Sequence, residues 1–283
     1  MYKYLCNLLD FLHKIVYTNF MKFALYVNSS KQNSQDVFDK IINELEKQGH
    51  AWTFFDEMQD DTDMIIVVGG DGTILTVVDK AVEKDIPVVA FNTGRVGFLA
   101  ELEADANLPL VISRLASGDY DIEYRCLIEA NIEGEDYLAL NEICVVRGEA
   151  FNVIKVHVED RGEYVASFYG DGVLVCTPTG STAYSLSAGG PVLAPTLKAL
   201  LLTPICPHSM YSRSTVLPED CLLTVKASAA KGASVVVDGV RYVEFSENVE
   251  FSVGLSDKKI KFVKLTNGEF YKKLHEKFAQ WSK

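Results

Sequence analysis

The sequence lacks several features that identify whole classes of protein. Its apolar runs all stop short of the ~20 residues that a membrane-spanning helix needs. Its 27 basic residues are outnumbered by 39 acidic ones, which gives a net charge of −12. That balance argues against a nucleic acid or an anionic membrane as the partner, since either would require a basic face. A small anion remains possible, because backbone N–H groups can hold phosphate in an acidic protein.

Cysteine pairs with metal-binding or redox spacing are also missing. The six cysteines are scattered, form no Cys-x-x-Cys pair and lie away from any histidine cluster: Cys6, Cys126, Cys144, Cys176, Cys206 and Cys221. We expect buried free thiols in a reducing compartment, hence a cytoplasmic protein, and we predict no protein-built metal site.

No internal repeat or low-complexity linker divides the 283 residues, which are enough for one large domain or two ordinary ones. Residues 1–20 have apolar residues at helical spacing, but charged residues interrupt them too often for a secretory signal. We expect an N-terminal extension here. It either lies upstream of a translation start at Met21 or forms an amphipathic helix.

Strand and helix patterns alternate over residues 21–118. Strands are predicted at 22–27, 51–55, 64–68 and 86–91, and helices at 34–48, 73–84 and 108–116. The run 64–68 is continuously apolar, as in a strand covered on both faces. This alternation predicts an α/β domain with a parallel, Rossmann-like or phosphofructokinase-like sheet.

The pattern changes near Asp119 to short β-rich segments, which continue to residue 265. We predict strands at 122–131, 136–146, 152–159, 163–169, 173–176, 222–228, 233–238 and 259–265. They indicate a second, mainly β, sandwich-like domain over 119–265. The remaining tail, 266–283, is predicted to carry a C-terminal helix at 269–281.

The run Gly69-Gly70-Asp71-Gly72-Thr73 follows the apolar strand directly. Glycines let the backbone approach a ligand, and Thr73 could cap the next helix, where phosphate is favoured. Asp71 would repel phosphates unless it held Mg²⁺ or accepted a proton from an attacking hydroxyl. The run lacks the Gly-Lys-Ser/Thr of a Walker A loop, and a tight turn with a capping acid is the alternative reading.

A second segment, residues 170–191, is hard to explain by packing alone. Thr177-Pro178-Thr179-Gly180 forces a turn, and several small hydroxyl residues then surround Tyr184. Ser181 or Thr182 could cap a short helix whose N-terminus faces a ligand. The alternative is a structural turn rich in serine and threonine.

Taken together, five segments resemble the NAD kinase family over nearly the whole chain from Met21. They are residues 69–73, 92–99, 141–142, 170–191 and 204–209. The first segment also occurs in diacylglycerol kinases, in sphingolipid kinases and, more distantly, in phosphofructokinases. The serine- and threonine-rich segment is far more specific. The resemblance implies phosphorylation of the 2′-hydroxyl of the adenosine ribose of NAD. ATP would be the donor with Mg²⁺ or another divalent metal, in a homodimer or homotetramer.

The same resemblance implies roles for particular residues. Asp71 matches the proton acceptor, Gly72 and Thr73 lie near the phosphates, and Asn141 with Glu142 hydrogen-bonds NAD. Asp171 matches an acid near the nicotinamide end. The segment around the dinucleotide comprises Thr182, Ala183, Tyr184, Ser185, Leu186 and Ser187. Asn152 and Tyr169 align loosely with ligand contacts, and His208 lies in a matching segment.

The chain departs from the family pattern at two positions. Val240 stands where many members have an amide that can contact the ligand, and Arg213 lacks the proline that usually follows it. Two other functions remain open at this point. One is a lipid kinase that shares the glycine-rich run, and the other is a sensor that binds NAD without turnover.

Overall fold

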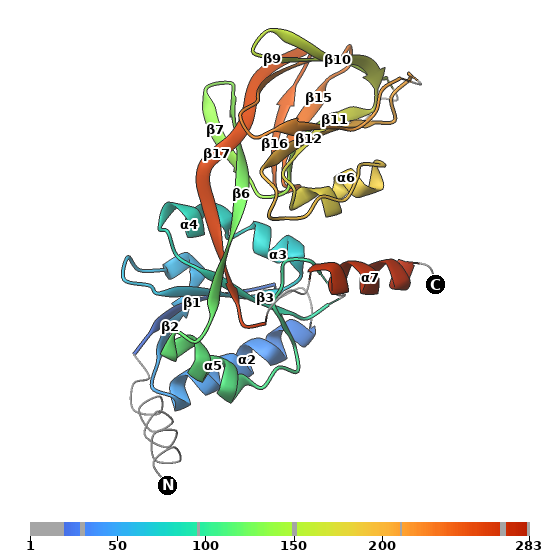
Figure 1. Ribbon diagram of the computed structural model, residues 1–283. Coiled ribbons are helices and arrows are strands. Elements are labelled where there is room, and N and C mark those ends of the chain that lie inside the picture. The colour runs from blue at the N-terminus through green and yellow to red at the C-terminus, as the bar shows by residue number, and fades with distance from the viewer. Residues whose placement is uncertain are drawn as a thin grey trace. The chain divides into compact units, whose positions relative to one another are not determined.

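A computed structural model describes residues 20–28, 32–94, 97–148, 152–209, 211–266 and 270–281. The chain divides into two compact units, the first made of residues 1–123 and 261–283 and the second of 124–260. The strands β6 (Asp121–Ile132) and β17 (Asn248–Lys264) connect them (Figure 1). Residues 1–19, most of the predicted N-terminal extension, lie outside the described residues.

The first unit contains the predicted parallel sheet, in the order β2–β1–β3–β4. Its strands are β1 (Lys22–Val27), β2 (Ala51–Phe54), β3 (Met64–Gly69) and β4 (Val88–Asn92). The short β5 (Leu102–Glu103) and the last part of β17 both pair with β4. Every residue of β3 is buried, as its continuous apolar run predicts.

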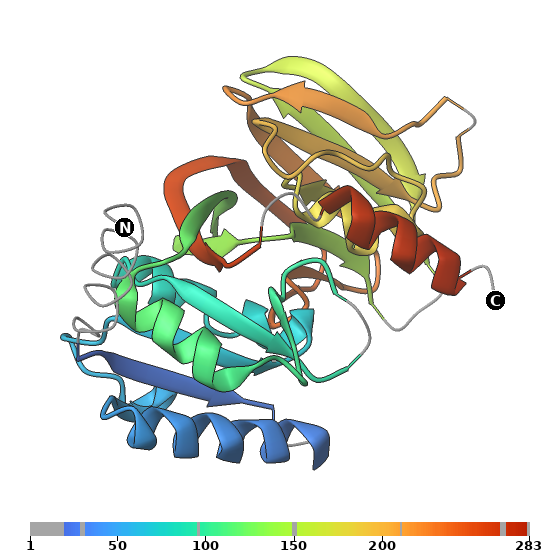
Figure 2. The ribbon, with the colours of Figure 1, turned by 60° about the horizontal axis from the view of Figure 1, so that its bottom comes forward.

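Two helices build the core of this unit against the sheet. They are α2 (Gln32–Lys47), which lies along β1 in Figure 2, and α5 (Leu108–Ser117). Ile41 and Leu45 of α2 pack with Ile112 of α5 and Ile66 of β3. Gly118 ends α5 with a φ of 71°, a left-handed conformation that glycine adopts without strain.

The helix predicted over 73–84 is wrong as a single element. It is two short helices, α3 (Asp71–Leu75) and α4 (Val78–Glu83). At the break, the Thr76 hydroxyl donates to the carbonyl of Thr73 at 2.7 Å, a local bond that competes with helix continuation. A single 3₁₀ turn, η1 (Phe55–Glu57), precedes this region, and α7 (Phe270–Trp281) is the predicted C-terminal helix.

The second unit is a sandwich of two antiparallel sheets. One contains β9 (Ile154–Asp160), β10 (Glu163–Gly170), β14 (Leu222–Ser228) and the first part of β17. The other has the order β13–β12–β11–β8–β15–β16, and β6 pairs with β7 (Glu135–Ala139). Alternate residues such as Val156, Val225, Val173 and Val235 face inward and form one core.

The outer face of the second sheet is covered as well. Its strands are β8 (Glu142–Arg147), β11 (Gly172–Cys176), β12 (Ala199–Ile205), β13 (Thr215–Pro218), β15 (Ala233–Val237) and β16 (Arg241–Phe245). Leu174 and Leu201 pack there with Leu193 from the segment that contains η2 (Gly180–Thr182) and α6 (Tyr184–Ser187). Because both faces are covered, β11 and β12 are buried throughout.

Several strand predictions in this unit need correction. The strand predicted over 136–146 is two strands, β7 and β8, separated at Leu140 and Asn141. The strands β12, β13 and β16 were missed, as was the first part of β17. The sequence of β12 is nearly all apolar, so it has no alternation that would distinguish a strand from a buried helix.

The cysteine prediction holds in part. All five cysteines in the described ranges are free thiols. Cys144, Cys176 and Cys221 are buried and Cys126 is half-buried, but Cys206 is exposed, so burial was wrong there. Cys6 lies outside the described residues.

Candidate active site

The glycine-rich run forms the turn between β3 and α3. Gly70 is the N-cap of α3, so the prediction that Thr73 caps this helix is wrong. Thr73 is instead buried inside the first turn, where its amide donates to the Gly70 carbonyl at 2.9 Å. A Cβ on Gly69 would lie 2.3 Å from the Thr73 hydroxyl oxygen, which explains a glycine there. An added Cβ on Gly70 or Gly72 meets nothing within 4 Å, so their backbone faces open space.

Asp71 begins α3 and is held by a distant segment of the same unit. Phe98 donates its backbone N–H to Oδ2 at 2.8 Å, and Leu99 donates to Oδ1 at 3.2 Å. Such charge-assisted bonds fix a carboxylate and leave lone pairs on both oxygens. Gly97 allows this approach, since a Cβ there would lie 2.1 Å from Oδ1. Residues 97–99 therefore have a physical role, which is to orient the acid of the loop.

In the second unit, Asn141 and Glu142 lie at the turn between β7 and β8, and a single carboxylate determines that turn. Asp238 accepts the backbone N–H groups of Leu140, Asn141 and Glu142 at 2.7, 2.8 and 3.0 Å. These bonds replace the strand ladder and explain why the predicted strand is interrupted. Asp238 and Gly239 have φ of 51° and 68°, the combination of a type I′ hairpin turn between β15 and β16.

Sequence reasoning did not single out Asp238 for this role. The available signal was the Asp-Gly pair between two β-rich runs, which predicts a tight hairpin but not the partner of its carboxylate. Val240, at the departure from the family pattern, follows in the same turn and is 43% exposed.

The side chain of Glu142 is buried next to this carboxylate. Burial raises the pKa of Glu142 to about 8, and repulsion from Asp238 adds to the rise, while a backbone N–H from Tyr184 opposes it. Burial also raises the pKa of Asp238, but its three N–H donors favour its anion. Glu142 is therefore the member of the pair that carries a proton near neutral pH. Its Oε2 is buried and has no hydrogen-bond partner among the residues the structure describes.

The segment 177–187 packs directly on this turn. Thr177 donates its hydroxyl to the carbonyl of Leu140 and its backbone N–H to that of Asn141. Gly180 lies so close that a Cβ would be 2.0 Å from the Asn141 carbonyl oxygen. The unusual composition of this segment therefore has a packing role, because small residues are required where two backbones meet.

The hydroxyl groups of this segment are largely engaged. Ser181 donates to the carbonyl of Pro178 and accepts from the amide of Leu193, and Thr182 donates to the carbonyl of Thr179 at 3.2 Å. The prediction that Ser181 or Thr182 caps α6 is wrong, because its N-cap is Ala183 and has no side-chain bond. The Ser185 hydroxyl is buried and lies 2.8 Å from that of Thr203. Thr182, Ala183 and Leu186 are half-buried, whereas Tyr184 and Ser187 are exposed.

A pocket of about 500 Å³ brings Asp171 and Tyr184 together. Arg147 and Cys206 also line it, and Val146 and Ile205 add apolar wall. Arg147 Nε donates to Asp171 Oδ1 at 2.8 Å, so the acid predicted at the nicotinamide end has a cationic neighbour. Sequence reasoning missed Arg147 and Cys206, since pairing between β8, β11 and β12 is what places them here.

The two loosely aligned residues, Asn152 and Tyr169, lie at the surface, and so does His208 of the matching segment. Asn152 is exposed ahead of β9, and Tyr169 on β10 is 53% exposed. The backbone N–H of His208 donates to the Tyr169 carbonyl at 2.7 Å, and the His208 residue is exposed. None of these three lines the pocket of Asp171.

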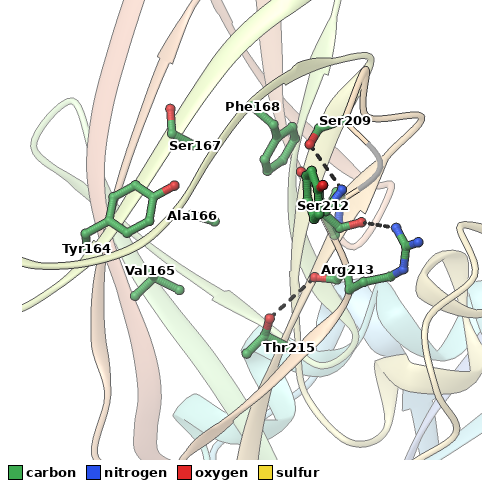
Figure 3. Close-up of a pocket in the computed structure, with 11 residues that line it drawn as sticks. Tyr164, Val165, Ala166, Ser167, Phe168, Ser209, Ser212, Arg213 and Thr215 are labelled. Atoms are coloured by element: carbon green, nitrogen blue, oxygen red, sulfur yellow. Dashed lines mark hydrogen bonds between the residues drawn. The ribbon is translucent and has the colours of Figure 1, made fainter.

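A second pocket of about 290 Å³ is lined by residues of β10, by Ser209 and by Tyr211, Ser212, Arg213 and Thr215 (Figure 3). Tyr164 and Phe168 of β10 line it together with Ser212 and Arg213. The Arg213 guanidinium donates to the carbonyl of Ser212 at 2.9 Å, so it mainly supports its own loop. None of the predicted site residues lines this pocket.

Among the residues that the structure describes, no group of three or more His, Cys, Asp or Glu side chains could hold a metal ion. None of the helices described is both long and apolar enough to cross a membrane.

Comparison with family models matches both halves of the chain. Residues 3–120 match the ATP-NAD kinase N-terminal domain, and residues 140–265 match the ATP-NAD kinase C-terminal domain.

Curated relatives are similar over nearly their full length. The NAD kinase of Caldicellulosiruptor bescii is 38% identical over 264 residues, which cover 92% of this chain and 100% of that protein. The NAD kinase of Clostridium botulinum strain Loch Maree is 33% identical over 274 residues, covering 92% and 97% of the two chains.

Solved structures have the same fold. An NAD kinase from Archaeoglobus fulgidus in complex with ATP has a TM-score of 0.75 at 27% identity, over 91% of this chain and 98% of that one. Yeast NADH kinase complexed with NADH has a TM-score of 0.83 at 22% identity, over 92% and 88%. This second likeness concerns the fold alone.

Proposed function

The chain belongs to the NAD kinase family, and from this premise we propose how its residues perform the reaction. The activity is transfer of a phosphoryl group from ATP to the 2′-hydroxyl of the adenosine ribose of NAD. The protein is thus a phosphotransferase acting on an alcohol group. Catalysis in such transfers consists mainly of positioning and charge stabilisation.

The proposed proton acceptor is Asp71. The observation that carries this role is its position at the start of α3, held by two backbone N–H groups beside the open backbone of Gly70 and Gly72. A carboxylate oriented in this way keeps lone pairs for a hydroxyl proton. The backbone of Gly70, Asp71 and Gly72 is proposed to approach the donor phosphates, and Thr73 supports this turn from inside.

The proposed dinucleotide residues belong to the second unit. Asn141 and Glu142 bind the ribose, and Glu142 is suited to this because its protonated carboxyl can donate as well as accept a hydrogen bond. A ligand hydroxyl would also satisfy Oε2, which is otherwise without a partner in the described residues. Tyr184 and Asp171, which share the larger pocket, are proposed to contact the rest of the dinucleotide, with the segment 182–187 around them.

Magnesium is proposed to come with the donor. Mg²⁺ keeps several waters and is held largely by substrate phosphates, so it needs no cage built by the protein alone. The metal would neutralise charge on the phosphates.

Asn152 is also proposed as a ligand contact, on the loose alignment alone.

Two further proposals concern the state of the protein. A homodimer or homotetramer is expected from the family resemblance, and size-exclusion chromatography with light scattering would measure it. A cytoplasmic location is supported by the five free thiols among the described cysteines, since disulfides are rare in a reducing compartment.

One assay tests the function. Purified protein is incubated with ATP, Mg²⁺ and NAD, and NADP is measured by a coupled dehydrogenase. We expect NADP to form in proportion to protein. Saturable NAD binding without NADP would favour the sensor, and phosphorylation of diacylglycerol or sphingosine in place of NAD would favour the lipid kinase.

A further inference from the structure

The C-terminal helix α7 packs against the segment that holds Asp71, within the first unit. The rings of Phe270 and Phe98 are 6.1 Å apart. Lys273 Nζ donates to the carbonyl oxygen of Ala100 at 2.7 Å. The helix is therefore anchored on Phe98 and Ala100. They belong to the segment whose Phe98 and Leu99 amides bind the Asp71 carboxylate.

Lys277 lies one turn beyond Lys273 on this face of the helix. Its ammonium is 4.2 Å from the centroid of the Phe98 ring, and the amide of Phe98 is 2.8 Å from Asp71 Oδ2. Burial lowers the pKa of Lys277, and attraction to Asp71 opposes this effect. A charge that loses solvation in this way requires anionic partners, and Asp71 is one of them.

The phosphate loop needs a cation that its own sequence does not supply. Residues 69–73 contain no lysine or arginine, in contrast to a Walker A loop, whose lysine reaches the β- and γ-phosphates. In phosphoryl transfer the developing charge on the equatorial oxygens is stabilised by metal ions and basic side chains. Lys277 has both a contact to Phe98 and an electrostatic interaction with Asp71.

We propose that Lys277 binds the γ-phosphoryl group of the donor and so serves the glycine-rich loop as its missing lysine, delivered from the C-terminal helix. The inference rests on the proposed function, since it assigns a residue to the donor of that reaction. Phe98 then has two tasks: its amide orients the acid, and its ring supports the lysine stem and the ammonium.

The competing explanation is that Lys277 only fastens α7 to Phe98. Three variants separate the two explanations: Lys277→Met, which keeps a flexible apolar stem, Lys277→Arg, which keeps the charge, and Lys272→Met, which removes an exposed charge from the same helix. Each is measured for KM of ATP, KM of NAD and melting temperature, and for ATP binding by calorimetry without NAD.

We expect Lys277→Met to weaken ATP binding and raise the KM of ATP about 10- to 100-fold, the usual effect of removing a charge-assisted bond. The KM of NAD and the melting temperature should change little, Lys277→Arg should restore most of the affinity, and Lys272→Met should behave as wild type. Unchanged ATP binding in Lys277→Met would overturn the inference, as would a lower melting temperature with equal losses for both substrates.

The calorimetry also separates this inference from the function. A wild-type protein that binds ATP through Lys277 but yields no NADP would refute the proposed reaction and leave the phosphate contact in place. If NADP forms but the Lys277 variants bind ATP as tightly as the wild type, the proposed reaction stands and the role of Lys277 is refuted.

Discussion

The two units each present one carboxylate at a strand end, and the two acids have opposite surroundings. Asp71 is half-buried and accepts two backbone N–H groups. Glu142 is 8% exposed, lies beside another acid, and has one oxygen without a partner among the described residues. The first arrangement leaves lone pairs that can accept a proton, and the second suits a neutral carboxyl that donates a hydrogen bond to a ligand.

The comparison teaches that environment assigns the roles. Both residues stand in short motifs that suggest ligand binding, and neither motif states which acid is charged. In the first unit the segment 97–99 brings donors to the acid, whereas in the second unit Asp238 takes the donors and leaves Glu142 to be protonated. Four predictions test this contrast.

The largest effect is expected for Asp71→Asn. The amide keeps the shape but cannot accept the hydroxyl proton, so kcat should fall about 10²- to 10⁴-fold. The melting temperature and the NAD affinity should stay near wild type, because Asn can still accept one of the two N–H bonds. Steady-state kinetics measures kcat, and calorimetry measures the melting temperature and the NAD affinity. Near-wild-type turnover would remove Asp71 from the role of base.

Asp238→Asn should lower the stability of the second unit. One amide oxygen cannot accept from three N–H groups, and its NH₂ would face them, so the free energy of unfolding should fall by about 2–4 kcal/mol. Urea denaturation measures the change. Asp136→Asn, at an exposed bond to Asn131 in the same unit, is the control and should cost less than about 0.5 kcal/mol. Equal effects of the two variants would contradict the role of Asp238.

Two glycine substitutions should affect different properties in the two units, turnover in the first and stability in the second. In Gly97→Ala the new Cβ meets the movable end of Asp71, so kcat should fall about 10- to 100-fold with little loss of stability. In Gly180→Ala it meets the backbone of Asn141, so stability should fall by about 1–3 kcal/mol. Kinetics and thermal denaturation of both variants test the contrast. A loss of stability in Gly97→Ala but not in Gly180→Ala would contradict this prediction.

The last prediction concerns the pH dependence of stability. The pKa of Glu142 is raised to about 8 in the folded protein from an ordinary value of 4.5, so the folded state binds the extra proton. Its stabilising contribution is full below pH 4.5 and is lost as pH rises toward 8, by at most about 1.4 kcal/mol per pH unit.

Glu142→Gln should remove that part of the pH dependence. The wild type minus variant difference in unfolding free energy, measured by urea denaturation from pH 4.5 to 8, should decline with rising pH. A flat difference would mean that Glu142 is ionised in the folded protein across this range.

Much of the fold follows from local pattern. The apolar run 64–68 predicts a buried strand, and the spacing of Phe38, Ile41 and Leu45 predicts α2, because the solvent-facing and core-facing positions repeat with the period of each element. Local sequence patterns fail to predict an element where a side chain distant in the sequence determines the backbone conformation. The strand over 136–146 is interrupted because the Asp238 carboxylate takes its amides, and no local signal near Leu140 announces a partner about a hundred residues away.

The sequence by itself determined the family and the activity and predicted Asp71 as the acid of the site, because the glycine-rich run and the segment 170–191 place their glycine, acidic and hydroxyl residues in a specific order. The tertiary structure decided what holds these residues in place. Phe98, Leu99 and Gly97 orient Asp71, Asp238 shapes the turn of Asn141 and Glu142, and Arg147 faces Asp171. These partners come from residues far apart in the chain, and a carboxylate's charge depends on the donors and the burial that only folding supplies.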